Sequence, residues 1–127
     1  MAPQDPYSSL LRQYFVSPVH AGALRGEYSL RLLAKVDDGS GTALQIEAGI
    51  DEGTLKELRF HALACPHLIA AAELFCERYE GRQIATLRDF RSIGIARELA
   101  IPVSKTGRIL LLEDAVTLLL QETGNET

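Results

Sequence analysis

The residues of this sequence most able to do chemistry are Cys65 and the two histidines that flank it, His61 and His67. Cys65 directly precedes Pro66, a residue suited to the first turn of a helix. At a helix N-terminus the dipole and the free backbone N–H groups lower the pKa of a thiol and make it nucleophilic. Thiolate and imidazole also bind zinc and iron. These residues therefore predict a reactive thiol or part of a metal site.

Each of these residues also has a purely structural interpretation. Free cysteine is among the most buried residue types, so Cys65 could be a small core residue. His61 could cap the edge of a sheet, and His67 could face solvent on the first helical turn. The second cysteine, Cys76, is expected in the core, about 16 Å from Cys65 if a helix rising about 1.5 Å per residue joins them. Because that separation exceeds disulfide reach, both cysteines are expected as reduced thiols.

No other catalytic constellation is visible in the sequence. It has no Ser-His-Asp arrangement, no glycine-rich phosphate loop and no paired-cysteine zinc motif. His20 is expected in a turn, and Glu113 and Asp114 are expected in ordinary helix contacts. Since no acid–base pair converges, we do not expect an enzyme.

Composition and charge indicate an ordinary globular domain. The chain is 46% apolar and 24% charged, a balance typical of folded domains. A net charge of -4 without clustered Lys and Arg argues against a nucleic-acid partner. No apolar run approaches the roughly 20 residues of a membrane span, and the N-terminus lacks the pattern of a signal peptide. We expect one cytoplasmic domain over residues 1–127, frayed at 1–6 and 122–127, without membrane contact.

Hydrophobic periodicity predicts one short helix followed by three strands. The helix covers residues 7–14, and the strands cover residues 27–36, 43–50 and 54–63 with glycine-containing turns between them. The alternation of residues in the third strand predicts that one of its faces is covered and the other is exposed to solvent. On this pattern Leu55, Glu57 and Arg59 share one face, and Lys56, Leu58 and Phe60 share the other.

The pattern of the second half of the chain predicts helices. The strongest signal covers residues 66–79, short helical turns are expected at 86–90 and 94–99, and a last helix covers 107–121. Strands grouped before helices predict an α+β domain with a three-stranded antiparallel sheet and helices packed on one face.

Several stretches, in order along nearly the whole chain, resemble the NifU/IscU-type iron-sulfur scaffold family, whose fold is SufE/NifU-like. They are Tyr7 with Tyr14-Phe15 and the turn Ser17-Pro18-Val19-His20-Ala21-Gly22, the hairpin residues Leu44-Gln45-Ile46, Asp51-Glu52-Gly53 and Leu58-Arg59-Phe60, the element Ala64-Cys65-Pro66 with Ala70-Ala71-Ala72, then Glu80-Gly81-Arg82, Ile95-Ala96-Arg97-Glu98-Leu99 and Leu112-Glu113-Asp114-Ala115-Val116. The resemblance implies a role in iron-sulfur cluster assembly.

The resemblance also implies a ligand set, most of which is missing here. Family members hold a nascent cluster or zinc with three cysteines, one from the first hairpin, one from a Gly-Cys-Gly turn and one from a His-Cys pair. Only Cys65 matches. Asp38 falls at the hairpin cysteine, and Gly107 and Arg108 fall at the His-Cys pair. Arg108 puts a permanent cation where a thiolate should be, which opposes Fe²⁺ or Zn²⁺ and favours an ion pair with Asp38 or the Cys65 thiolate.

Two functions remain open at this point. In the first, a divergent scaffold-like protein binds iron, zinc or an iron-sulfur cluster, or accepts sulfur, through Cys65; a rearranged metal site would use Cys65, Asp38 and either His61 or His67. A cluster shared across a homodimer would also need only one cysteine per chain. In the second, the chain is a non-catalytic interaction or regulatory module that has kept the fold and lost the cluster.

The resemblance further implies partners. A cysteine desulfurase and apo iron-sulfur proteins are the expected ones. The family's chaperone-recognition segment, Leu-Pro-Pro-Val-Lys, is reduced here to Ile101, Pro102, Val103, Ser104 and Lys105. One proline and the lysine remain for partner binding.

Overall fold

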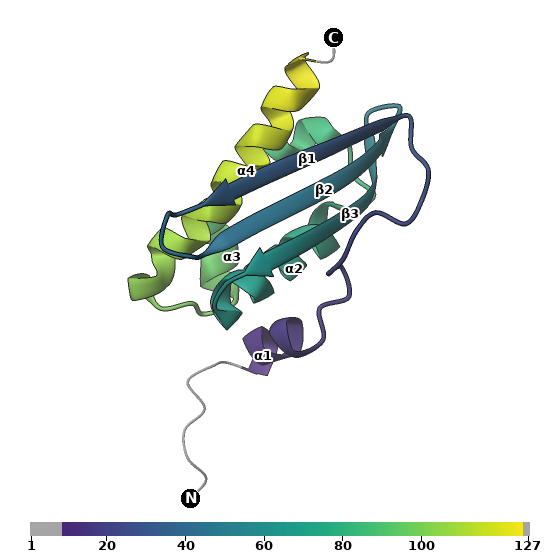
Figure 1. Cartoon of the computed structure of the whole chain (residues 1–127). Helices are drawn as coiled ribbons and strands as arrows, with labels where there is room; N and C mark the ends of the chain where they lie inside the picture. Colours follow the sequence, from purple (N-terminus) through teal and green to yellow (C-terminus); the bar gives the residue numbers. More distant parts are fainter. Residues whose placement is uncertain (1–8, 126–127) are drawn as a thin grey trace, which may run out of the picture.

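The protein is built around a three-stranded antiparallel sheet with strand order β1-β2-β3, as Figure 1 shows. The computed structural model describes residues 9–125. The strands are β1 (Leu30–Asp37), β2 (Ala43–Asp51) and β3 (Thr54–Leu63). The predicted bounds of β3 are confirmed, whereas β1 begins at Leu30 instead of residue 27. Ser29 donates its N–H to the Asp51 carboxylate at 2.7 Å, so the chain is still turning into the sheet at that point.

The helical elements are one long helix, α4, and several shorter ones. They are α1 (Ser9–Val16), α2 (Pro66–Tyr79), the 3₁₀ helix η1 (Ile84–Asp89), α3 (Ser92–Glu98), the 3₁₀ turn η2 (Val103–Lys105) and α4 (Thr106–Asn125). The predicted bounds of α2 are confirmed. α4 continues past its predicted end at Gln121, and Glu122 in its last turns accepts the Leu33 N–H of β1 at 3.1 Å. None of the helices within residues 9–125 is long and apolar enough to cross a bilayer.

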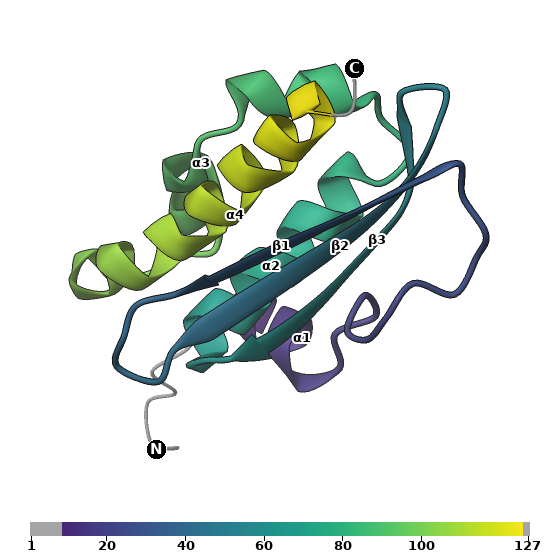
Figure 2. The same cartoon turned by 45° about the horizontal axis from the view of Figure 1, so that its top comes forward.

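The helices form a layer on one side of the sheet. α4 packs against β1 and β2, α2 packs against β3, and α3 lies against both helices, as Figures 1 and 2 show. The core between the layers is mainly apolar, with Ile46, Leu58, Phe60, Phe75 and Leu112 each at most 2% exposed. The α+β class with helices on one face is therefore confirmed.

A β-bulge in β3 changes which side chains share a face. Gly49 of β2 pairs with Glu57, but the next residue, Ile50, pairs with Leu55, so Lys56 is an extra residue. Leu55 consequently points into the core with Leu58 and Phe60. The predicted grouping of Leu55 with Glu57 and Arg59 is wrong, because one inserted residue shifts the alternation of a strand.

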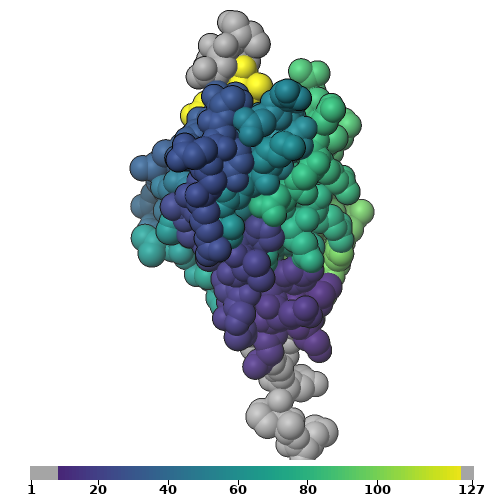
Figure 3. Space-filling model, turned by 90° about the vertical axis from the view of Figure 1, so that its right-hand side faces the viewer, coloured from purple at the N-terminus to yellow at the C-terminus, as the bar shows by residue number. Residues whose placement is uncertain are grey.

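The segment of residues 17–29, called the strap below, joins α1 to β1 and runs along the free edge of β3. Figure 3 shows it as a purple-to-blue band on that surface. Backbone bonds tie it to β3, from Phe60 N–H to His20 O at 3.0 Å and from Gly22 N–H to Phe60 O at 2.9 Å. The buried Glu73 of α2 accepts the His20 N–H at 2.7 Å and lies 2.5 Å from His20 Nδ1. His20 is thus a buried anchor of the strap.

A second buried carboxylate, Glu57, holds the far part of the strap. It accepts the backbone N–H groups of Arg25 and Gly26, the hydroxyl of Tyr28 at 2.6 Å and Nε of Arg59 at 2.6 Å. Burial alone raises the pKa of Glu57, but these hydrogen bonds outweigh it and bring the pKa to about 2. Glu57 is therefore ionised at neutral pH.

Candidate functional site

One end of the sheet gathers the three positions that the sequence singles out. β1 ends and β2 begins there around the turn that contains Asp38, β3 ends there before Cys65, and α4 starts there with Arg108. Figures 1 and 2 both show these three segments at the same end of the molecule. In an antiparallel sheet the first and third strands run the same way, so their ends meet. The fold therefore assembles the site from parts distant in sequence.

Cys65 caps the N-terminus of α2. Its backbone is extended, with φ -70° and ψ 162°, and Pro66 follows in the first turn. The Cys65 carbonyl accepts the N–H of Leu68 at 3.1 Å and of Ile69 at 3.2 Å. The side chain is a half-buried free thiol. A thiol in this position lies among the unpaired N–H groups of the helix start.

The surroundings of Cys65 favour the thiolate. Burial acts to raise the pKa of the thiol, but hydrogen bonds from the Leu68 N–H and from the Arg108 side chain act in the opposite direction. The positive charge of Arg108 adds to them, and the net pKa lies below that of an ordinary cysteine. Arg108 thus contacts Cys65, one of the two ion-pair partners that the sequence suggests.

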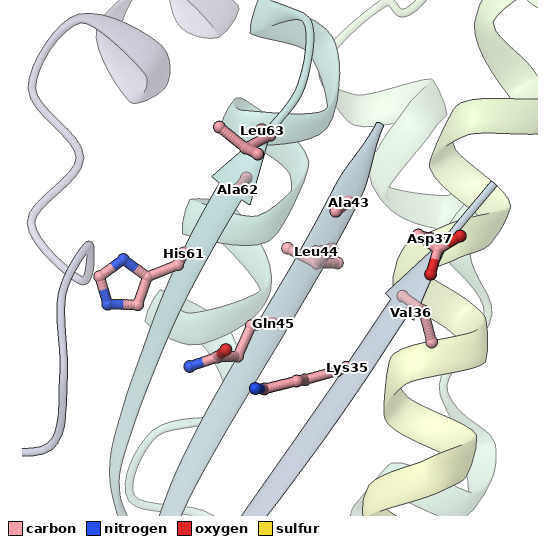
Figure 4. Close-up of a pocket in the computed structure, with 9 residues that line it drawn as sticks. All are labelled: Lys35, Val36, Asp37, Ala43, Leu44, Gln45, His61, Ala62 and Leu63. Atoms are coloured by element: carbon pink, nitrogen blue, oxygen red, sulfur yellow. The ribbon is translucent and has the colours of Figure 1, made fainter. Parts of the chain in front are cut away.

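The two flanking histidines lie on different sides of the sheet. His67 is in the first turn of α2 and only 6% exposed, so the expectation that it faces solvent is wrong: the turn is pressed against the rest of the helical layer. Burial lowers the pKa of His67, and the positive charges of Lys105 and Arg108 lower it further. His61 lies on the open outer face of β3, as Figure 4 shows. The two imidazoles cannot both face Cys65.

The Asp38 carboxylate accepts hydrogen bonds from residues of its own turn. Its carboxylate accepts the Ser40 N–H at 2.9 Å, the Ser40 hydroxyl at 2.7 Å and the Thr42 N–H at 3.3 Å. The bonds from Ser40 are the main cause of the lowered pKa of Asp38. This arrangement is an Asx turn, in which an aspartate side chain closes a loop.

These residues do not form a ligand set. Within residues 9–125, no three His, Cys, Asp or Glu side chains lie close enough together to hold a metal ion. A cluster or a structural zinc needs three or four converging ligands, mostly thiolates. Here a single thiol, that of Cys65, lies beside the Arg108 guanidinium. The site therefore does not fit a cluster held by this chain's own residues.

The reduced partner segment lies beside this end of α4. Ile101 is half-buried, Pro102 is exposed and precedes η2, and the Val103 side chain is 88% exposed. Lys105 ends η2 and contributes to the positive field around His67. An apolar residue so exposed is available for contact with another protein, as are isolated apolar residues on many surfaces.

Sequence reasoning missed the buried polar pairs that shape the surroundings of the site. Glu73 is 3% exposed and Glu57 is 6% exposed, and each holds part of the strap. Glu73 stands in the apolar run of α2, and an acid on the buried face of a helix is a signal that it has a buried partner. Its partner His20 lies 53 residues earlier, which no local pattern indicates.

Comparisons with known proteins agree with this architecture. The family model described as "NifU-like N terminal domain" matches residues 6–122. The chain is 28% identical over 113 residues to the "Iron-sulfur cluster assembly scaffold protein IscU" of Rickettsia prowazekii, covering 87% of this chain and 86% of that one. It is 32% identical over 78 residues to the protein of the same description from Escherichia coli strain K12, covering 61% of this chain and 60% of that one.

A solved structure has the same fold. The crystal structure described as a nitrogen-fixing NifU-like protein (N-terminal) from Brucella abortus superposes with a TM-score of 0.72. The alignment covers 94% of this chain and 95% of that one at 14% sequence identity. At this identity the likeness concerns the fold alone.

Proposed function

Because this chain belongs to the NifU-like N-terminal domain family of iron-sulfur cluster assembly scaffolds, we propose that it serves cluster assembly by accepting sulfur on Cys65. The observation that carries the proposal is the Cys65 thiol at the start of α2, hydrogen-bonded by Arg108 and lowered in pKa. A half-exposed thiolate is the nucleophile that sulfur transfer needs. Arg108 supplies the counter-charge that a metal ion supplies in a ligand site.

The transfer is balanced without an added oxidant. The Cys65 thiolate attacks the outer sulfur of a persulfide on a donor protein. A new S–S bond forms at Cys65, the donor's S–S bond breaks, and its electron pair leaves with the donor as a thiolate. Cys65 then carries a persulfide, whose anion Arg108 stabilises as it stabilised the thiolate. The chain takes up one sulfur per site and catalyses no turnover of its own.

The proposed donor is a cysteine desulfurase, and the proposed recipient is an apo iron-sulfur protein. Both are partners that the family role suggests, and both meet reduced thiols in a reducing compartment such as the cytoplasm. Under this proposal the iron-sulfur cluster itself is completed on other proteins. This division of labour follows from a ligand set with one thiolate, in which Asp38 closes a turn and Arg108 repels cations.

Sulfur uptake is tested with glutathione persulfide as the donor under anaerobic conditions. Intact and peptide mass spectrometry of the wild-type protein should show one added sulfur, located on Cys65. The buried Cys76 is an internal control and should stay unmodified while the protein is folded. Cys65→Ser should take up none, and Arg108→Gln should react several-fold more slowly. Absence of sulfur on Cys65 in the folded wild type would refute the proposal.

Metal binding is measured on the same proteins. After incubation with iron, zinc and sulfide, the wild type and Cys65→Ser should both hold well below one metal per chain. A stoichiometric metal or cluster that disappears in Cys65→Ser would replace the sulfur-acceptor proposal with a metal site, including one shared between two chains.

A second candidate is an interaction module without chemistry. The observation that favours it is the missing ligand set on an intact fold, with Val103 exposed beside the site. Under this function Cys65→Ser would keep full binding to a desulfurase in a pull-down, and wild-type Cys65 would acquire no sulfur from it.

A further inference from the structure

The edge of β3 that faces away from β2 is only partly covered. Leu58 donates its N–H on this edge to the Glu80 carboxylate at 2.8 Å. Phe60, two residues further on, donates its N–H to His20 O at 3.0 Å. Peptide groups of an antiparallel strand alternate between its two edges, so the N–H and C=O of Ala62 point to this same edge.

The strap does not pair with Ala62. Its last backbone bond to β3 runs from the Gly22 N–H to Phe60 O at 2.9 Å, and the Leu24 N–H then reaches the Glu47 carboxylate of β2 at 2.8 Å. Within residues 9–125, neither the N–H nor the C=O of Ala62 has a hydrogen-bond partner. Figure 4 shows Ala62 near the arrowhead of β3. The end of this strand therefore presents an unpaired donor and an unpaired acceptor.

This open stretch lacks the features that protect sheet edges. On the opposite edge of the sheet, Glu122 of α4 accepts the Leu33 N–H of β1 at 3.1 Å. No described residue does the same at the end of β3, where Ala62, Leu63 and Ala64 are small or apolar and Leu63 is 73% exposed. Unprotected edges pair with extended segments of other chains.

We propose that an extended segment of the sulfur donor pairs with this edge and so presents its persulfide to Cys65. The inference rests on the sulfur-acceptor function proposed above. The backbone of the segment donates to the C=O of Ala62 and accepts its N–H, as the strap does at Phe60. An extended backbone carries a donor and an acceptor side by side, which an inorganic anion does not.

The edge leads directly to the thiol. Cys65 follows Ala62 by three residues, and its backbone is still extended, with φ -70° and ψ 162°. Three extended residues span about 10 Å, so a persulfide about three residues from the paired position of the donor segment comes level with Cys65. Pairing at Ala62 thus sets which residue of the donor meets the thiol.

The test uses thiol–disulfide exchange with short activated peptides, because it follows the same attack by the Cys65 thiolate. The probes are acetyl-Thr-Val-Thr-Cys(S-pyridyl)-amide and acetyl-Cys(S-pyridyl)-Thr-Val-Thr-amide, one for each direction of pairing. The thiolate attacks the peptide sulfur, a mixed disulfide forms, and pyridinethiolate leaves with the electron pair of the broken S–S bond. The absorbance of the released pyridinethiolate gives the rate.

One of the two peptides should react at least about fivefold faster than acetyl-Cys(S-pyridyl)-amide, since each net hydrogen bond contributes roughly a factor of two to ten. A copy of the faster peptide with N-methylated Thr and Val residues should lose this advantage.

Ala62→Pro removes the edge N–H without removing a ladder bond to β2, a change that edge strands tolerate. The variant should lose most of the peptide advantage and keep the wild-type rate with iodoacetamide, which reports on the thiol alone. Ala62→Ser keeps the N–H and is the matched control, with the full advantage expected. Should Ala62→Pro fail to fold, judged by circular dichroism, the N-methylated peptide on the wild type decides.

Several outcomes would overturn the proposal. They are a wild type that shows no advantage for either peptide, an advantage that survives N-methylation, or one that a folded Ala62→Pro retains. A wild-type dimer in sedimentation that Ala62→Pro abolishes would replace the sulfur donor by a second copy of the chain as the occupant.

Sulfur uptake from glutathione persulfide needs no pairing with the edge, so the two proposals can fail separately. Uptake on Cys65 without a peptide advantage would refute the edge pairing and leave the sulfur-acceptor function standing. A peptide advantage without uptake would refute the sulfur-acceptor function, and with it the sulfur donor as the occupant.

Discussion

At Cys65, opposing influences on one thiol decide what the residue can do. Burial raises the pKa of the thiol, whereas the N–H groups at the start of α2 and the Arg108 guanidinium lower it, and the net pKa lies below that of an ordinary cysteine. A metal-binding relative would use metal as the counter-charge. Here the Arg108 guanidinium lowers the pKa of Cys65 without a metal ion.

The role of Arg108 can be measured from the reactivity of the thiol. Removing its charge in Arg108→Gln takes away a hydrogen bond and a cation from the thiolate, so the pKa of Cys65 should rise. Alkylation by iodoacetamide near pH 7 should slow several-fold, and the midpoint of its pH profile should move upward. Arg97→Gln, an exposed arginine of α3, is the matched control and should react like the wild type. An unchanged profile in Arg108→Gln would contradict the assigned contact.

Glu57 predicts a specific acid sensitivity. Its pKa is depressed from 4.5 to about 2 in the folded protein, so the stability that it contributes is present above pH 4.5 and is lost as the pH falls toward 2. Glu57→Gln should lower the unfolding free energy near pH 7 by roughly 2–3 kcal/mol, because buried donors lose a charged acceptor. The substitution should also flatten the pH dependence of the unfolding free energy between pH 4.5 and about pH 2. Urea unfolding at a series of pH values measures both effects.

The control for this prediction is Glu27→Gln, since the Glu27 side chain is fully exposed. It should leave stability and the acid limb nearly unchanged. An acid limb in Glu57→Gln as steep as in the wild type would show that other carboxylates account for it.

At the scale of elements, the strap and the sheet fit together through a missing side chain. Tyr28 of the strap lies over Gly49 of β2 and reaches Glu57 with its hydroxyl. A glycine in a strand usually weakens it, but it permits close approach of another group. The aromatic ring covers the gap that the glycine leaves.

Gly49→Ala should therefore be costly. The new Cβ would lie 2.2 Å from the Tyr28 ring, so the ring would have to leave and its bond to Glu57 would break. We expect a loss of roughly 1–3 kcal/mol in unfolding free energy, as for other overpacked sites. In a Tyr28→Ala background the same substitution should cost much less. Gly94→Ala, where a Cβ meets nothing within 4 Å, is the control and should be neutral or slightly stabilising.

At the end of α3, replacing a residue by glycine should stabilise the protein. Ala100 has φ 55°, a left-handed conformation that favours glycine. Ala100→Gly should raise the unfolding free energy by about 0.5–1 kcal/mol, measured by urea or thermal unfolding. Ala85→Gly, at an exposed position of η1 without positive φ, should lower it by a similar amount. Destabilisation by both substitutions would contradict the left-handed assignment.

At the scale of the whole molecule, the fold is that of the scaffold family, and no three possible metal ligands lie together among residues 9–125. The sheet and helical layer bring the β1–β2 turn, the start of α2 and the start of α4 to one end, which is the arrangement that a three-point site requires. The residues at these three points are Asp38, Cys65 and Arg108, which offer a single thiol. The architecture therefore allows a three-point site, and the side chains at the three points decide whether it can bind a metal.

Metal-binding side chains placed at these three points should create a metal site. In the triple variant Asp38→Cys, Gly107→His, Arg108→Cys, three thiolates and an imidazole become available with Cys65. We expect about one zinc per chain by elemental analysis and a raised melting temperature in the presence of zinc. Adding Cys65→Ser to the triple variant should remove most of the bound zinc. If the triple variant folds but stays metal-free, the three segments do not converge closely enough.

Much of this protein could be predicted from its sequence. The bounds of β3 and α2 follow from local signals, namely Gly53 in the preceding turn and Pro66 at the helix start. That the chain has only two cysteines, Cys65 and Cys76, is also read directly from the sequence. Local chemistry also places the Cys65 thiol at a helix N-terminus, where its reactivity originates.

The tertiary structure decided the features that depend on contacts between distant residues. Burial of His67 depends on how the helical layer packs, the bulge at Lys56 depends on pairing with β2, and the strap anchors depend on carboxylates far along the chain. Which backbone groups of β3 face its open edge at Ala62 is settled only by the pairing with β2. Residue types and spacing determine local conformation, whereas register and packing are collective properties that no single segment encodes.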